Sequence, residues 1–84
     1  MLYRMSFHVG PVSKSQGEQL ARPLRDIGCD PLVGTETIYF TIWGEDAIGA
    51  NVTARAMLRD FFPKCAFDVR VMFPVRSHHD KAVS

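Results

Sequence analysis

The chain lacks any run of apolar residues long enough to span a bilayer. It also lacks the unbroken apolar stretch of an export signal, because apolar and polar residues alternate over residues 1–9. Neither sign of charge is in excess, because ten Lys and Arg stand against nine Asp and Glu. Proteins that grip nucleic acid through its phosphates usually carry a clear basic surplus. The balance therefore argues against that class and against an anionic membrane surface. Because no export signal is evident, we expect a cytoplasmic protein.

Motifs for catalysis and metal binding are also scarce. Cys29 and Cys65 are too far apart for a C-x-x-C site, and in a reducing compartment we expect free thiols. His78-His79-Asp80 offers metal-ligand types, but adjacent histidines in a polar tail have no preformed geometry. No nucleophile elbow, H-E-x-x-H motif or dinucleotide fingerprint occurs. We expect no catalytic residue, no metal and no cofactor.

The 84 residues are enough for one compact domain. The composition, 46% hydrophobic and 23% charged, is typical of a globular protein. We expect residues 1–76 to form this single domain and residues 77–84 to form a flexible polar tail. A core of this size is thin, so dimerisation would be a natural way to bury more surface.

Within three segments, near residues 2–9, 35–43 and 67–73, every second side chain is apolar, which is the period of two that is typical of strands. Their apolar positions predict one buried sheet face, made of Met5, Phe7, Ile38, Phe40, Val69 and Val71. In the last segment the pattern also puts Phe67 and Phe73 on the face of Val69 and Val71.

Two further segments have the apolar spacing of helices. The first is predicted to start near Ser15, which with Glu18 forms an S-x-x-E capping box, and to end at Gly28. Pro23 is predicted to kink it.

Asp46 can cap the second helix, and Pro63 ends it. Because Gly49 weakens its first turns, a start at Asn51 is the alternative.

A short strand near residues 29–33, joined by a two-residue turn at Gly34-Thr35 to the long strand that follows, completes the order β-α-β-β-α-β. This order predicts an α+β, ferredoxin-like sandwich with a four-stranded antiparallel sheet and two helices on one face. Without the short strand, the sheet would have three strands under the same helix layer.

The face that the helices leave uncovered carries aromatic, arginine and methionine side chains, which are the types that anchor interfaces. We predict a partner-binding surface there, made of Arg4, His8, Tyr39, Thr41, Trp43, Arg70 and Met72. The alternative is a solvated sheet with Trp43 covered by a loop or by the tail.

The loop Gly10–Gly17 joins a strand to a helix N-terminus, where backbone N–H groups favour an anion. Ser13, Lys14 and Ser15 are the predicted anion-binding residues. The loop is similar in position to the phosphate loop of acylphosphatases. Gly10, Val12, Gln16, Gly17 and Arg22 follow their motif only with insertions, so we do not assign the chain to that family.

The sequence thus predicts a small non-enzymatic module, a regulator or an inhibitor such as a phage or mobile element encodes, that binds another protein or itself as a homodimer. One alternative is a domain that binds single-stranded nucleic acid by stacking bases on Tyr39 and Trp43. The first strand offers no aromatic residue for this, and the third lacks the RNA-recognition signature. The other alternative is a small acyl-phosphate or phosphoester hydrolase that uses the Gly10–Gly17 loop.

Overall fold

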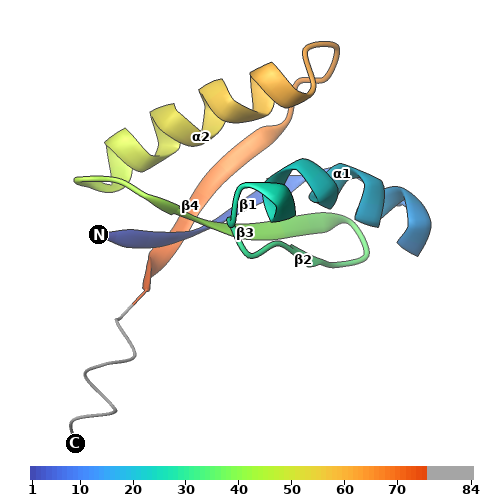
Figure 1. Cartoon of the computed structure of the whole chain (residues 1–84), viewed down its shortest axis with the longest axis horizontal. Coiled ribbons are helices and arrows are strands. Elements are labelled where there is room, and N and C mark those ends of the chain that lie inside the picture. The colour runs from blue at the N-terminus through green and yellow to red at the C-terminus, as the bar shows by residue number, and fades with distance from the viewer. Residues whose placement is uncertain (76–84) are drawn as a thin grey trace, which may run out of the picture.

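The computed structural model describes residues 1–75, which form a ferredoxin-like α+β sandwich as predicted (Figure 1). Its elements are β1 (Leu2–His8), α1 (Lys14–Asp26), β2 (Leu32–Val33), β3 (Thr37–Trp43), α2 (Ala47–Phe61) and β4 (Asp68–Val75). The strands form one antiparallel sheet in the order β2-β3-β1-β4. The predicted tail, with His78-His79-Asp80, lies outside the described residues.

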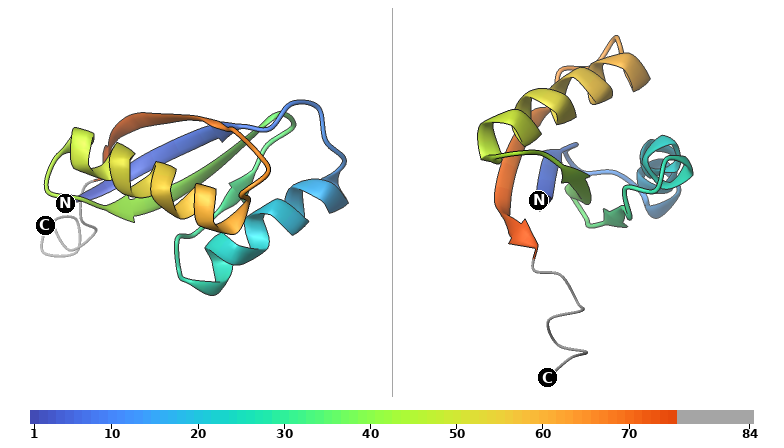
Figure 2. Two further views of the ribbon diagram at one scale, coloured as in Figure 1. Left: turned by 90° about the horizontal axis from the view of Figure 1, so that it is seen from above. Right: turned by 60° about the vertical axis from the view of Figure 1, so that its left-hand side comes forward.

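The core lies between the sheet and the helices, which both cover the same face (Figure 2). Its largest fully buried side chains are Phe7, Phe40, Met5, Leu24 and Ile38. The rings of Phe7 and Phe40 meet edge to face, with centroids 5.8 Å apart. The period-two pattern therefore identified the buried face of β1 and β3 correctly. In the part of the chain that the structure describes, no helix is long and apolar enough to cross a membrane.

The start of α1 differs from the prediction. Ser13, not Ser15, is the N-cap: its hydroxyl accepts from the Gln16 backbone N–H at 3.1 Å, and the Gln16 side chain accepts from the Ser13 N–H at 2.9 Å. Glu18 is free of any capping role and pairs with Arg25 at 2.8 Å. The capping box is thus two residues earlier than predicted.

The end of α1 follows the prediction. Gly28 has a φ of +81°, a left-handed conformation that glycine adopts at low cost. The N–H of Cys29 donates to the Leu24 carbonyl at 2.9 Å and that of Gly28 to the Arg25 carbonyl at 3.1 Å, which is the Schellman pattern. The helix continues for one turn beyond Pro23 before it ends.

In α2, Asp46 is the N-cap as predicted, with its carboxylate accepting from the Gly49 N–H at 2.7 Å. The cap holds the first turn in place, so the helix begins at Ala47 and not at Asn51. It ends at Phe61, two residues before Pro63.

The short strand exists but is smaller than predicted, because β2 spans only Leu32–Val33. Val33 pairs with Ile38 and β3 begins at Thr37, so the connection is a loop over residues 34–36 and not a two-residue turn at Gly34-Thr35. The Gly34 N–H closes this loop by donating to the Thr37 carbonyl at 2.8 Å. Val33 also packs against Gly17 of α1, where a β-carbon would lie 2.5 Å from the Val33 Cγ1 atom.

A β-bulge in β4 overturns the predicted alternation of the last strand. Val71 pairs with Met5 but Phe73 pairs with Arg4, so Met72 is an extra residue opposite β1. Beyond the bulge the side chains change faces, and Phe73 leaves the face of Val69 and Val71. It is 51% exposed, on the side of the sheet away from the helices.

The outer strands offer little free edge for another strand. β2 has only two residues. On β4 the Asn51 side chain of α2 donates to the Val69 carbonyl at 3.3 Å, the bulge lies at Met72, and Pro74 has no N–H. Short edges, bulges and prolines all disfavour pairing with a further strand.

Candidate binding surface

The open face is the side of the sheet that neither helix covers. Antiparallel register places its side chains in four rows across β4, β1 and β3, which are Asp68–His8–Thr37, Arg70–Ser6–Tyr39, Phe73–Arg4–Thr41 and Val75–Leu2–Trp43. The first two rows are polar and the last is apolar. Arg4 lies in the third row, where the two kinds of surface meet.

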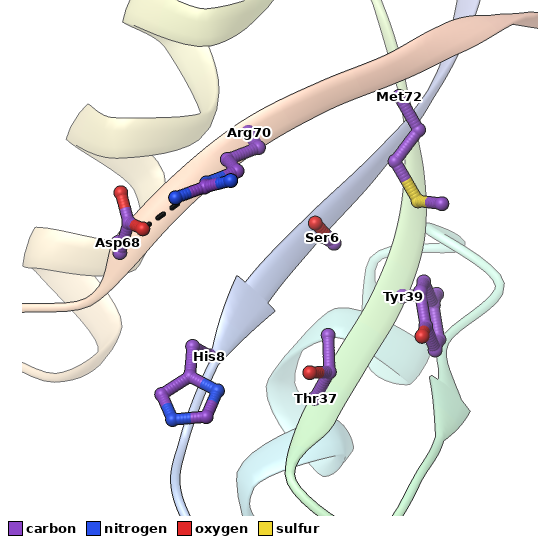
Figure 3. Close-up of a pocket in the computed structure, with 7 residues that line it drawn as sticks. All are labelled: Ser6, His8, Thr37, Tyr39, Asp68, Arg70 and Met72. Carbon is purple, nitrogen blue, oxygen red and sulfur yellow. Dashed lines mark hydrogen bonds and ion pairs between the residues drawn. The ribbon is translucent and has the colours of Figure 1, made fainter.

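At the polar end an open hollow of about 500 Å³ is lined by Ser6, His8, Thr37, Tyr39, Asp68, Arg70 and Met72 (Figure 3). Arg70 Nε donates to Asp68 Oδ2 at 3.2 Å, and both side chains are well exposed. An exposed pair of this kind contributes about 0–1 kcal/mol to stability. Its main effect here is that the two charges neutralise each other at the rim of the hollow.

The hollow contains the residue types of a catalytic triad, but they are not arranged as one. The Asp68 carboxylate pairs with Arg70, and within residues 1–75 no hydrogen bond links His8 to Ser6 or to Asp68. The His8 ring lies apart from both side chains (Figure 3). A working triad needs the base bonded to the nucleophile and oriented by the acid. The geometry gives no support for nucleophilic catalysis at this hollow.

Three large apolar side chains are exposed on the open face, two in the rows at its apolar end and Met72 at the bulge beside the hollow. Trp43 is 69% exposed, Phe73 51% and Met72 46%. Trp43 and Phe73 stand on β3 and β4, on either side of the central strand β1, which carries Leu2 and Arg4. The sequence predicted Trp43 and Met72 on the open face, and the exposure of Trp43 means that no described loop covers it.

Arg4 has an unusual environment for an arginine. It is only partly exposed, and its Nη1 atom is buried without a hydrogen-bond partner among the described residues. No ion pair within residues 1–75 includes it. A buried N–H group that lacks an acceptor has lost water without replacing it, which destabilises the folded chain.

Thr41, which the sequence placed in the binding surface, is committed to the fold. It is 9% exposed, and its hydroxyl donates to the Cys29 carbonyl at 3.2 Å. The Thr41 backbone N–H donates to the same carbonyl at 2.8 Å. This residue ties the segment after α1 to β3, and its hydroxyl proton is already donated within the chain.

Phe73, Leu2 and Val75 belong to the open face and were missed from the sequence. The available signal was Pro74, because proline within a strand is confined to edges and bulges. A strand that tolerates it at its second-last residue is a candidate for irregular pairing.

The predicted anion-binding residues lie at the start of α1, away from the open face. The Ser13 hydroxyl is engaged in the capping box. Lys14 lines a separate hollow of about 400 Å³ with Glu18, Arg25 and the β2 edge. Anion binding at Ser13, Lys14 and Ser15 stays a prediction.

The described residues hold no cluster of three or more His, Cys, Asp and Glu side chains that could bind a metal ion. Comparison with known proteins gives no further assignment, because no protein-family model, no curated protein and no solved structure matches this chain.

Proposed function

We propose that this protein is a small non-enzymatic interaction module that binds another protein, or a second copy of itself, through its open sheet face. The observation that carries the proposal is the exposure of Trp43, Met72 and Phe73 on that face. Aromatic and methionine side chains supply much of the binding energy of protein interfaces. Exposed on an isolated chain, they leave apolar area in contact with water.

The sheet edges give less support for an interaction site than the face does. A partner strand pairing with β4 would meet the bulge at Met72, the missing N–H of Pro74 and the Asn51 side chain on the Val69 carbonyl. β2 offers only two residues on the other edge. Docking onto the face needs none of these backbone groups.

The outer surface of α2 also exposes apolar side chains, Ile48 at 77% and Val52 at 62%. They are aliphatic, and aliphatic side chains are less common than Trp, Tyr and Arg among residues that dominate binding energy. Ile48 is therefore a suitable position for a matched control.

A cytoplasmic location is part of the proposal. Cys29 and Cys65 are both free thiols, which is consistent with a reducing compartment.

Single-stranded nucleic acid is the second proposal for the same face. Tyr39 lines the same hollow as His8 and Arg70, across β1 from Arg70, so a base could stack on its ring with a phosphate reaching the cations on the other side. Arg70 already has Asp68 as its counterion, which weakens the support for a phosphate there.

Site-specific photocrosslinking tests the main proposal. Benzoylphenylalanine replaces Trp43 on the open face in one variant and Ile48 on α2 in the other, and each full-length protein is irradiated in the cells that naturally produce it. We expect discrete protein adducts from position 43, of twice the chain mass for self-association and of other masses for a different partner. Position 48 should give few. Adducts from position 48 alone, or nucleic-acid adducts from position 43, would overturn the proposal.

A further inference from the structure

The charges on the open face are unevenly balanced. Asp68 and Arg70 pair with each other at 3.2 Å. Arg4 has no ion-pair partner among residues 1–75, so it supplies the uncompensated positive charge in the middle of the face. His8 lies at the far end of β1, two rows away.

Any partner that covers Trp43 and Phe73 must also cover Arg4. Arg4 lies opposite Phe73 on one side. On the other side its partner is Thr41, two residues before Trp43 along β3. Its guanidinium already has one buried nitrogen without an acceptor. Removing the remaining water from this group, with no counterion in its place, would strongly disfavour the complex.

We propose that the partner is a protein segment presenting an Asp or Glu carboxylate among apolar side chains, and that this carboxylate binds the Arg4 guanidinium while its neighbours pack on Trp43, Met72 and Phe73. This inference rests on the proposed function. A carboxylate suits Arg4 because its two oxygens match the planar fork of the guanidinium N–H groups. Apolar neighbours suit the aromatic surface around it.

Charge also separates this partner from the other occupants. A second copy docked face to face would bring its own Arg4 to the apolar end, and like charges in an interface oppose association. A nucleic-acid strand brings a phosphate at every nucleotide, and matching them needs several cations. One uncompensated arginine in an apolar setting fits a single carboxylate better.

A displayed library of random 12-residue peptides tests the inference on the full chain. The wild type is selected in parallel with Arg4→Gln and with Arg55→Gln, in which an exposed arginine of α2 is changed. We expect the wild type and Arg55→Gln to enrich peptides with Asp or Glu beside Leu, Phe or Trp. Arg4→Gln should retain the apolar preference and lose the acidic one.

The best peptide is then synthesised together with a form in which its acidic residue is replaced by the corresponding amide. Calorimetry should show that this replacement weakens binding to the wild type at least about 30-fold, as expected for a desolvated charge pair. The same replacement should change binding to Arg4→Gln by less than about 3-fold, since the pair is already broken. Arg4→Lys, which keeps the charge, should still prefer the acidic peptide if Arg4→Gln proves unstable.

The outcomes separate the two proposals. Apolar peptides without acidic residues, bound in a way that Trp43→Ala abolishes, would overturn the carboxylate inference and leave the interaction face standing. Enrichment of basic peptides would overturn the inference as well. Failure to obtain any peptide whose binding depends on Trp43 or Phe73 would count against both.

Discussion

Phe73 on β4 lies directly opposite Arg4 on β1, although strict alternation along β4 would place Met72 there. The extra residue at Met72 shifts the register by one and moves the Phe73 side chain from the core face to the open face. It thereby adds an aromatic ring to the side of the sheet that already carries Trp43. The composition of the candidate binding surface depends on this single irregularity.

The first prediction concerns the place of Phe73. Phe73→Ala should lower the free energy of unfolding by about 1 kcal/mol or less, because the ring is half exposed. Phe40→Ala, the matched change at a fully buried ring, should lower it by about 3–5 kcal/mol. Urea unfolding measures both. A loss near 3 kcal/mol for Phe73→Ala would mean that β4 has no bulge and that the ring lies in the core.

The second prediction concerns the contact between Gly17 and Val33. A β-carbon at Gly17 would lie 2.5 Å from the Val33 Cγ1 atom, and a valine side chain has little freedom to move aside. Gly17→Ala should therefore destabilise the protein, because overpacking costs about 1–3 kcal/mol and exceeds the gain of about 1 kcal/mol in helix propensity.

Val33→Ala supplies the control for that contact. In this background, Gly17→Ala should stabilise the chain relative to Val33→Ala alone, since the clash is gone and the helix preference remains. Equal effects of Gly17→Ala in both backgrounds, measured by thermal or urea unfolding, would show that α1 does not pack on Val33.

The third prediction tests the N-cap of α1. Ser13→Ala should lower the free energy of unfolding by about 1 kcal/mol, because it removes the acceptor of the Gln16 N–H. Ser15→Ala is the matched change at the second residue of the helix, and it should alter the free energy of unfolding by no more than about 0.5 kcal/mol. The reverse order of the two effects would restore Ser15 as the cap.

The fourth prediction concerns the two thiols. Burial raises the pKa of the Cys29 thiol above its usual value of 9.0, whereas Cys65 is exposed. With iodoacetamide at pH 8, peptide mass spectrometry should therefore find Cys65 alkylated well before Cys29. Comparable rates in the native protein would place Cys29 at the surface, and in urea we expect the difference to disappear.

The same shift gives the sign of a pH effect. The unfolded chain loses the Cys29 proton at a lower pH than the folded chain, so the folded state binds more protons near pH 9. The free energy of unfolding should fall as the pH rises from about 8.5 towards the raised pKa. Cys29→Ala should lack this part of the decline in urea unfolding measured across that range.

The fifth prediction addresses nucleic acid. The chain has a net charge of +1, and on the open face Arg70 already has a counterion. We therefore expect the purified protein to elute from a sizing column without absorbance at 260 nm beyond that of its own aromatic residues. Co-elution with nucleic acid that dissociates steeply as salt rises would favour the nucleic-acid proposal over the protein-binding one.

Much of the fold could be predicted from the sequence because its signals are local. The alternation through Met5 and Phe7 and the glycine at position 28 each report on their own segment. The cap of α1 could not be chosen in the same way, since Ser13-x-x-Gln16 and Ser15-x-x-Glu18 both fit a capping box. The two choices differ in where α1 meets the sheet, and this depends on contacts such as Gly17 with Val33.

The candidate surface was predictable to the extent that pairing is regular. Arg4, His8, Tyr39, Trp43, Arg70 and Met72 lie on the open face because each follows the simple alternation of its strand or stands at the bulge itself. Thr41 is closed off by the Cys29 carbonyl, which arrives from a distant part of the chain. Phe73 changed sides because of its pairing with β1. The burial of Thr41 and the changed face of Phe73 both come from contacts between segments, which a pattern along one segment does not contain.

The Asn51 contact on the Val69 carbonyl has a consequence for assembly. The edge strand β4 is blocked by a helix side chain, a bulge and a proline, and the edge strand β2 has only two residues. These edges disfavour repeated edge-to-edge pairing of sheets from successive copies. Under the proposed association through the open face, by contrast, no further copy can bind once that face is covered. The expected products are therefore complexes of fixed stoichiometry, and not fibres that lengthen with concentration.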